Sequence, residues 1–361
     1  MRRSAAMQQN EAGVAKKHYL VLDGLRGIAA IAVVISHRRW FAPGGHAFDH
    51  GLLAVNFFFM LSGFVIDHAY TARLAKGMTL TNFAMRRAIR LYPLIIAGAL
   101  LGLSYTLSLA YVHKNPSLYQ NYFIAATFNL FCLPAPMGFV ESPFFINRPT
   151  WSLFFELIAN AGFGIFLFRF SNKALWITLF FTLPMVIYVA FQAGTINIGF
   201  NYGDLLSGIP AVFAPFIIGI LINRSQHLIK LPELPFWLSG LILIFLFQPY
   251  IYNDAREPIY QIVLMLIVFP LLIMASTRSE PTGLWRSTAR FGGFISYPVY
   301  VLHYPILQFV SGAGEILKIP HPVTLCIIVI ASIVVAWVAG KYYDEPVRRW
   351  LESKLLRKKA H

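Results

Sequence analysis

The stretch PVTLCIIVIASIVVAWVAG, residues 322–340, contains 19 residues and not one charged side chain. A helix rises about 1.5 Å per residue, so a stretch of this length crosses most of the roughly 30 Å hydrocarbon core of a bilayer. A run of 18 or more apolar residues is typical of a transmembrane helix rather than of a soluble core. This stretch therefore predicts a membrane span.

The same character recurs along the whole chain. Further spans are predicted at residues 25–40, 51–68, 91–110, 151–168, 174–192, 205–222, 235–251, 259–275 and 291–312. An additional apolar segment, residues 119–133, is too short for a full span, so we expect an interfacial or re-entrant segment there. The predicted fold class is all-α, a polytopic transmembrane helical bundle of about ten spans.

Composition excludes several other classes of protein. Of the 361 residues, 57% are hydrophobic and only 12% are charged, whereas a soluble domain carries about 25% charged residues. This excludes an ordinary soluble enzyme, a disordered chain and a disulfide scaffold. The net charge of +15 suits nucleic acid or a membrane surface, and the apolar content favours the membrane. No nucleic-acid partner is expected.

The distribution of lysine and arginine predicts the orientation. With ten spans, the loops on one side carry 23 of these residues and the opposite loops carry 6, so both termini should be cytoplasmic and the protein should lie in the inner (cytoplasmic) membrane. No removable signal peptide is expected in the polar residues 1–17. Residues 1–350 are predicted to form the transmembrane domain, and residues 351–361 a basic cytoplasmic tail beside anionic membrane lipid.

Two ionisable residues in the first span lie on one helix face. Arg26 and His37 are 11 residues apart, which at ~100° per residue brings them to within ~20° of each other and separates them by ~16 Å along the axis. Arg26 would lie at the inner mouth and His37 beyond the middle of the membrane. Ionisable side chains at such depth are costly and commonly functional. A histidine satisfied within the bundle is the alternative for His37.

Other spans supply polar groups at similar depth. Ser62 is expected near mid-bilayer, Glu156 about 8 Å below the outer interface, and His303 at the depth of His37. A carboxylate that meets a histidine can orient it as a general base, so we predict His37 and Glu156 as catalytic residues, with His37 oriented by Glu156 or by another carboxylate. A network of hydrogen bonds that merely joins helices is the alternative for these residues.

Arg87 and Arg90 lie on one helix face at the inner side. They are three residues apart, and guanidinium groups bind phosphate with two parallel hydrogen bonds. The pair predicts a clamp for a phosphorylated cofactor that arrives from the cytoplasm, with ordinary topology-determining arginines as the alternative. No CxxC or HExxH spacing occurs in the sequence, so no metal site is expected.

These residues lie within a series of motifs that resembles the acyltransferase-3 family of membrane O-acyltransferases. The motifs are LDGLRG at 22–27 with His37, FFFMLSGF at 57–64, RAIRLYP at 87–93, TWSLFFE at 150–156, residues 296–303, and DEP at 344–346. The resemblance extends from Leu22 to about Trp350. Each motif alone is weakly specific, but together and in this order they are highly specific.

The resemblance implies a function and a set of roles. The donor would be cytoplasmic acyl-CoA, most often acetyl-CoA, and the acceptor a hydroxyl of a carbohydrate or glycolipid at the extracytoplasmic side. Arg87 and Arg90 would bind the nucleotide phosphates, Arg26 would guide the pantetheine arm or its phosphates, and His37 would act at the thioester. Trp151 and Glu156 would shape the acceptor side. Some family members carry a fused extracytoplasmic domain that finishes the transfer, so a separate transfer partner is a further possibility.

The expected reaction is direct transfer. His37 would take the proton of the acceptor hydroxyl, while Ser62 or Tyr297 would donate to the developing oxyanion, and His303 is a further acceptor-side candidate. An acyl-histidine intermediate is equally compatible with the sequence. The main alternative function is a proton-coupled transporter or flippase that uses the same arginine, histidine and glutamate cluster, and a non-catalytic scaffold is a second alternative.

Overall fold

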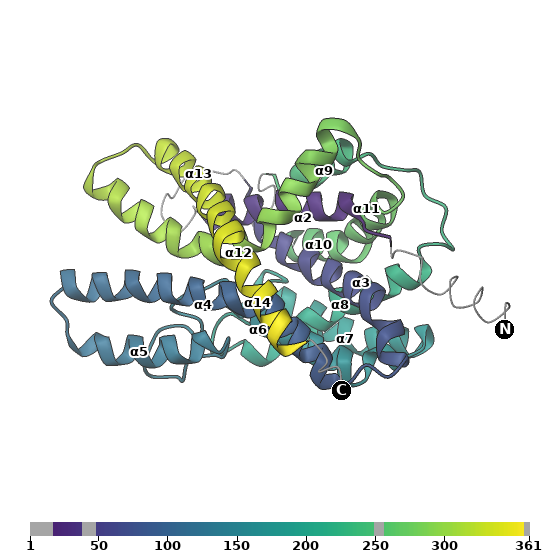
Figure 1. Cartoon of the computed structure of the whole chain (residues 1–361), viewed down its shortest axis with the longest axis horizontal. Helices are drawn as coiled ribbons and strands as arrows, with labels where there is room; N and C mark the ends of the chain where they lie inside the picture. The colour runs from purple at the N-terminus through teal and green to yellow at the C-terminus, as the bar shows by residue number, and fades with distance from the viewer. Residues whose placement is uncertain (1–16, 38–47, 249–255, 357–361) are drawn as a thin grey trace.

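The computed structural model describes residues 17–37, 48–248 and 256–356, and within these ranges the chain forms helices and loops but no strand. Several predictions fall outside the described residues. They concern residues 1–16 of the polar N-terminal segment, the predicted outer arginines Arg38 and Arg39, and residues 357–361 of the basic tail. The helices, shown in Figure 1, are α2 (Leu20–Ser36), α3 (Ala54–Ala75), α4 (Leu80–Val112), α5 (Ser117–Leu130), α6 (Thr150–Ile165), α7 (Asn172–Ala193), α8 (Gly208–Ser225), α9 (Phe236–Leu246), α10 (Arg256–Val263), α11 (Phe269–Ser276), α12 (Gly283–Ile316), α13 (His321–Ala339) and α14 (Glu345–Leu355). Two π-helical turns, η5 (Leu264–Val268) and η6 (Gly340–Asp344), join α10 to α11 and α13 to α14. The predicted all-α class is confirmed for these residues.

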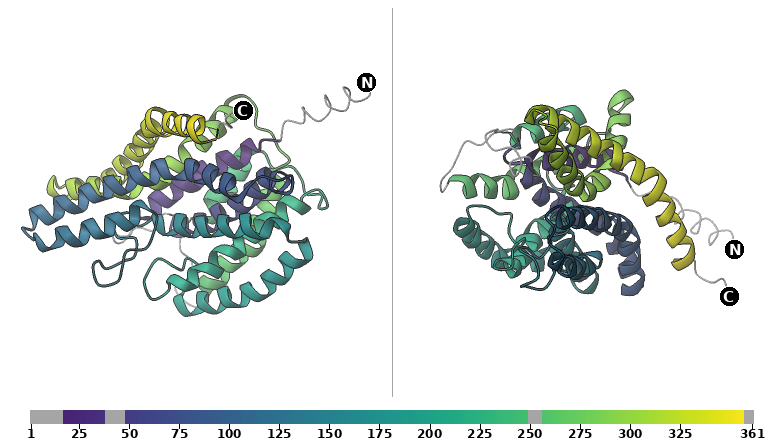
Figure 2. Two further views of the ribbon diagram at one scale, coloured as in Figure 1. Left: turned by 60° about the horizontal axis from the view of Figure 1, so that its bottom comes forward. Right: turned by 90° about the vertical axis from the view of Figure 1, so that its left-hand side faces the viewer.

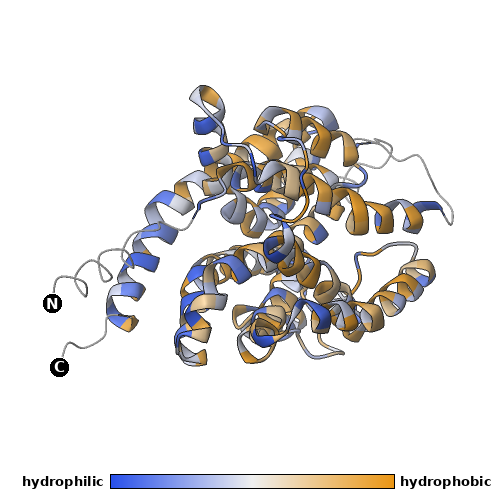
Figure 3. Cartoon of the chain, turned by 90° about the vertical axis from the view of Figure 1, so that its right-hand side faces the viewer, coloured by the Kyte–Doolittle hydropathy of each residue, from blue (hydrophilic) through white to orange (hydrophobic). Residues whose placement is uncertain are grey.

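The helices match the apolar stretches of the sequence. Each of the ten predicted spans overlaps a helix. Among the described residues, six helical segments are long and apolar enough to cross a membrane: Gly51–Ala75, Leu80–Val112, Asn172–Ala193, Leu205–Ser225, Arg256–Ser276 and His321–Leu355. Figure 3 shows hydrophobic colour over most of the helical surface and hydrophilic residues along the helix that leads to the C-terminus. The chain is therefore a multi-pass membrane protein.

The predicted re-entrant segment forms α5, which runs back alongside α4 (Figure 1 and Figure 2). Its end approaches the middle of α4, where the Tyr92 hydroxyl donates to the carbonyl oxygen of Phe131 at 3.1 Å. The following loop stays at this level, because the Asn147 side chain donates to the carbonyl oxygen of Val301 at 2.9 Å and a Cβ on Gly102 would collide with the backbone of Ile146. As a result α6 begins beside the middle of α4 rather than beside its C-terminal end.

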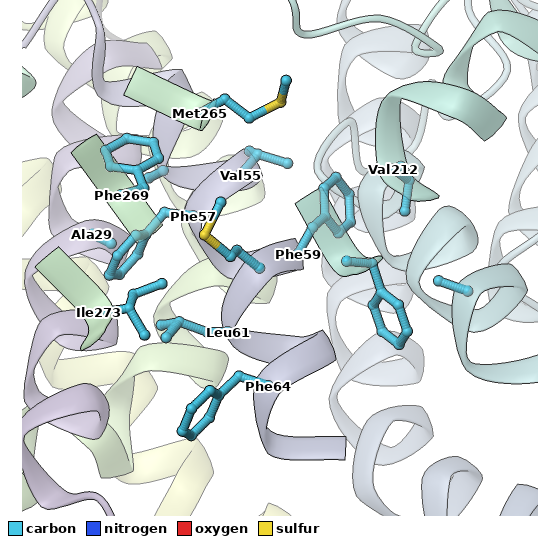
Figure 4. Close-up of a cluster of buried hydrophobic side chains, with 14 of the residues drawn as sticks. Ala29, Val55, Phe57, Phe59, Leu61, Phe64, Val212, Met265, Phe269 and Ile273 are labelled. Carbon is cyan, nitrogen blue, oxygen red and sulfur yellow. The ribbon is translucent and has the colours of Figure 1, made fainter. Parts of the chain in front are cut away.

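Apolar side chains of α3 form the centre of the core. Phe57, Phe59, Leu61 and Phe64 are almost completely buried, and Figure 4 shows them between side chains of α2, α8, η5 and α11. The rings of Phe57 and Phe269 pack edge to face with centroids 5.4 Å apart. This packing fixes α3 as the central helix against which the polar site is built.

Glycines allow α3 and α8 to pack backbone to backbone. A Cβ on Gly63 would collide with the carbonyl oxygen of Phe216, and a Cβ on Gly219 with that of Met60. Small residues of this kind let membrane helices approach closely, so that van der Waals contact holds them together where no hydrophobic effect acts between helices. Toward the C-terminal ends of the same two helices, Arg224 donates to the buried Asp67 carboxylate at 2.7 and 3.0 Å.

We expect Gly219→Ala to lower the stability of the protein by about 1–3 kcal/mol, since the added methyl group meets backbone atoms that cannot rotate away. The measurement is the Tm of the detergent-purified protein. Gly312→Ala is the matched control, because Gly312 also lies in a helix and no atom lies within 4 Å of an added Cβ there. Equal Tm values for the two variants would contradict close packing of α3 on α8.

Candidate active site

Helices α2, α3, α4, α6 and α12 enclose a cavity of about 180 Å³. Its polar lining comes from Arg26, Ser62, Arg87, Arg90, Ser152, Glu156, Ser296, Tyr297 and Tyr300. Six of these are residues that the sequence singled out, and they come from five different helices. Because three of the lining residues are arginines, the cavity suits an anionic ligand. We refer to it below as the inner cavity.

Glu156 holds the polar lining of the inner cavity together. Its Oε1 atom accepts a hydrogen bond from the Ser62 hydroxyl at 3.0 Å and one from the Arg87 guanidinium at 3.1 Å. Arg87 still has a buried Nε–H without a hydrogen-bond partner among the described residues. Glu156 thus fixes Arg87 in place while leaving part of its donor capacity for a ligand.

The other two arginines of the inner cavity are also positioned by contacts. Arg26 donates to the Asp23 carboxylate, one turn earlier in α2, at 3.0 Å. Arg90 lies over the ring of Tyr297 at 5.4 Å from its centroid, a favourable cation–π arrangement. The Tyr297 hydroxyl donates to the carbonyl oxygen of Leu91 at 2.6 Å. Three positive charges therefore converge on one small volume.

A second cavity of about 60 Å³ lies next to the inner one and contains His37. Arg148, Trp151, Asn197 and Phe200 also line it, and we call it the outer cavity. The Trp151 and Phe200 rings lie with centroids 6.1 Å apart. Asn197 is held by Asn56, whose side-chain amide donates to it at 3.0 Å. The outer cavity thus combines a histidine, a cation and two aromatic rings.

The backbone fixes the tautomer of His37. Its Nδ1 lies 2.8 Å from the carbonyl oxygen of Val33, and a carbonyl oxygen only accepts hydrogen bonds, so Nδ1 carries the proton. Nε2 is left with its lone pair, which is what a general base requires. His303 lies beside it, with ring centroids 5.0 Å apart.

His303 is held in the same way as His37. Its Nδ1 faces the carbonyl oxygens of Val299 and Tyr300 at 3.1 and 2.9 Å. Its Nε2 is buried and has no hydrogen-bond partner within the described part of the chain. In this tautomer Nε2 accepts a hydrogen bond and does not donate one.

The two cavities share two lining residues, Val55 and Tyr300. Ser152 donates to the carbonyl oxygen of Pro149 at 3.0 Å, so the Tyr300 hydroxyl, which is hydrogen-bonded to Ser152, donates to the Ser152 oxygen. Tyr300 thus stands fixed at the junction between the basic cavity and the histidine. Tyr300 lies within the motif at 296–303 and follows Tyr297 by one helical turn, but it was not predicted as a site residue.

Most predicted site residues are brought together, but the predicted pairing of His37 with Glu156 is not the one that the contacts show. Glu156 is bonded to Ser62 and Arg87 in the inner cavity, whereas His37 is bonded to Val33 in the outer cavity. The reason is the course of the chain: α6 begins beside the middle of α4, so Glu156 lies beside Arg87 near the start of α4 instead of near its C-terminal end. The sequence predicted Glu156 near one membrane surface and Arg87 near the other. Their contact shows that this prediction was wrong.

The proposed oxyanion donors also have partners in this structure. The Ser62 hydrogen is directed to Glu156 and the Tyr297 hydrogen to Leu91. Either hydroxyl would have to change partner before it could donate to a reacting carbonyl oxygen. Trp151 lines the cavity that contains His37.

A multi-pass helical protein with a basic cavity next to a histidine is the class that the fold and site define. Residues 19–341 match the family model described as an acyltransferase domain. Because the match covers most of the chain, this protein belongs to the acyltransferase-3 family. Membership decides in favour of an acyltransferase over the transporter, flippase and scaffold alternatives.

Several named proteins are similar to this chain. Protein 2 in picA locus of Rhizobium radiobacter is 35% identical over 156 residues, which cover 40% of this chain and 80% of that protein. The peptidoglycan O-acetyltransferase OatA of Listeria monocytogenes is 24% identical over 92% of this chain and 56% of its own length. The exopolysaccharide production protein ExoZ of Rhizobium meliloti is 24% identical over 84% of this chain and 92% of its own length. The chain thus spans about half the length of OatA, and no solved structure matches it.

The contact between Arg87 and Glu156 gives a test of the site geometry. We expect Arg87→Ala to destabilise the ligand-free protein, because the largely buried Glu156 carboxylate loses its cation. Glu156→Gln should restore part of that loss in the double variant, with an interaction energy of about 0.5–3 kcal/mol. The measurement is the Tm of the two single variants and the double variant. Strictly additive effects would show that the two side chains do not interact.

Proposed function

We propose that this protein is a membrane O-acetyltransferase that moves an acetyl group from cytoplasmic acetyl-CoA to a hydroxyl of a carbohydrate or glycolipid at the extracytoplasmic side. The observation that carries the proposal is the pair of adjoining cavities, one with three arginines and the other with a histidine in the base tautomer. The names of the similar proteins, a peptidoglycan O-acetyltransferase and an exopolysaccharide production protein, support the acetyl group and the carbohydrate.

The proposed orientation follows from the charge distribution. Ten spans with both termini in the cytoplasm leave 23 lysines and arginines on the inner side and 6 on the outer side, as the positive-inside rule requires in an inner membrane. Residues 1–350 would then form the transmembrane domain and residues 351–361 the cytoplasmic tail. In this orientation the inner cavity opens toward the cytoplasmic supply of donor.

The donor fits the inner cavity by charge. Coenzyme A carries a diphosphate and a 3′-phosphate at one end and the acyl thioester at the end of a long, flexible arm. Arg87 and Arg90 would bind the phosphates, since guanidinium groups match phosphate oxygens in pairs. Arg26 would guide the arm past Tyr300 toward His37. Among the described residues no three His, Cys, Asp or Glu side chains are grouped so that they could hold a metal ion. The proposed reaction uses no metal.

The reaction follows from the tautomer of His37. His37 Nε2 takes the proton from the acceptor hydroxyl, and the hydroxyl oxygen attacks the thioester carbonyl carbon. The carbon–sulfur bond breaks, the acetyl ester forms, and the leaving thiolate takes the proton from His37. Tyr300 and Val55, which line both cavities, stand between the donor and the acceptor in this reaction.

The acceptor site is the outer cavity. Trp151 and Phe200 present aromatic faces on which a sugar ring can pack, and Asn197 supplies a side-chain amide. A hydroxyl that enters between these groups reaches His37. A separate extracytoplasmic partner that passes the acetyl group on to a larger polymer is compatible with this arrangement.

Donor binding can be measured before the acceptor is known. We expect acetyl-CoA to raise the Tm of the detergent-purified wild type and of His37→Ala, but not that of Arg90→Ala. A ligand at 100 times its Kd stabilises a protein by about 2.7 kcal/mol, which a melting curve resolves. If millimolar acetyl-CoA and longer acyl-CoA molecules leave the wild-type Tm unchanged, coenzyme A thioesters are not the donor.

Catalysis by His37 has its own test. A positioned general base contributes about 10²–10⁴-fold to the rate, so His37→Ala should reduce base-labile acetate on the cell-envelope carbohydrate of cells that depend on this protein to background. Expression level and the acetyl-CoA-induced Tm shift should stay as in the wild type. Full acetylation by the His37→Ala variant would contradict the role of the histidine.

A further inference from the structure

The C-terminal helix reaches the arginine face of α4. Helix α13 continues through the turn η6 into α14, and α14 packs on α4 (Figure 1). The Tyr343 hydroxyl donates to the carbonyl oxygen of Pro93 at 3.1 Å, three residues beyond Arg90. A segment about 250 residues away in sequence therefore lies at the rim of the inner cavity.

This helix brings one more arginine to the rim. Arg348 lies 3.1 Å from the carboxylate of Asp344, one turn earlier in the chain, and Asp344 is 2% exposed. Arg90 interacts electrostatically with both of them. The arrangement repeats that of Arg87 with Glu156, in which a carboxylate fixes an arginine beside the cavity.

Donors of two of these arginines lack acceptors. Arg348 faces the Asp344 carboxylate through its Nε, and its two terminal amino groups make no hydrogen bond within the described residues. The Arg90 guanidinium lies over the Tyr297 ring and likewise makes no hydrogen bond to a described residue. Two guanidinium groups with free N–H donors on neighbouring helices therefore suit a ligand that is rich in anionic oxygens, which is the character of a phosphate group.

We propose that Arg348, held by Asp344, binds the 3′-phosphate of the coenzyme A donor. The inference rests on the proposed function, which places the thioester near His37. The adenosine end with its 3′-phosphate is then the part of the donor farthest from His37, at the cytoplasmic rim where α14 lies. Arg348 does not line the inner cavity itself, so a role at the rim is the one that its position allows.

The neighbouring residue supplies a control. Arg349 is paired with Glu345 at 3.1 Å, and its side chain is 78% exposed. Arg349 carries the same charge as Arg348 and lies in the same helix, but its side chain is exposed. If α14 acted only through its positive charge, replacing Arg348 or Arg349 would have the same effect on ligand binding. If Arg348 binds a phosphate at the rim, only its replacement should weaken binding.

The test is a comparison of two ligands on the full chain. Isothermal titration calorimetry of the purified protein with coenzyme A and with 3′-dephospho-coenzyme A reports the contribution of the 3′-phosphate. We expect the wild type to bind coenzyme A at least about tenfold more tightly than the dephospho form. Arg348→Ala should lose that preference by weaker binding of coenzyme A alone, and Arg349→Ala should keep it.

Each outcome is decisive. Retention of the preference in Arg348→Ala, equal weakening for both ligands, or a wild type that does not distinguish them would overturn the role of Arg348 and leave the proposed donor standing. If the wild type binds neither ligand, the proposed function fails and the inference fails with it. Should Arg348→Ala not fold, Arg348→Gln keeps the length of the side chain and removes the charge, and the same comparison applies.

Discussion

The arrangement of the helices around the inner cavity depends on the need to neutralise guanidinium groups in an apolar surrounding. A charged side chain in a low-dielectric interior is costly unless an opposite charge lies beside it. Three arginines meet this need with one carboxylate each, in the pairs Arg26–Asp23, Arg87–Glu156 and Arg348–Asp344. A carboxylate occupies only part of the five N–H donors of an arginine. The pairing therefore fixes the positive groups and at the same time leaves them able to bind an anion.

This constraint also fixes the positions of helices. The pair between Arg87 and Glu156 joins α4 to α6, and the Ser62 hydroxyl adds α3 to the same carboxylate. If α6 shifted by one turn, Glu156 would be left without its cation and Arg87 without its carboxylate. The junction of the two cavities follows from this register, because Ser152, one turn before Glu156 in α6, holds the hydroxyl of Tyr300.

The sequence predicted the features that depend on residues close together in the chain, namely the helices and the residues that share a helix face. The apolar stretches located the helices, and the spacing of Arg87 and Arg90 placed both on the inner cavity. The partner of Glu156 could not be found in this way, because its depth was inferred from a span assumed to open at the outer surface. In the structure the chain first returns along α4 as α5, which lowers the start of α6. The approach of α14 to α4 likewise joins segments that no sequence spacing connects.

The contacts of His37 bear on how the proton moves. A carboxylate hydrogen-bonded to a catalytic histidine orients the ring and stabilises its protonated form. In this protein a backbone carbonyl oxygen orients the ring of His37, and the neighbouring His303 offers only a lone pair. A neutral carbonyl stabilises an imidazolium less than a carboxylate does. In the proposed reaction, a protonated His37 is therefore best suited to a short-lived step, in which it receives the proton of the acceptor hydroxyl and passes it at once to the leaving thiolate.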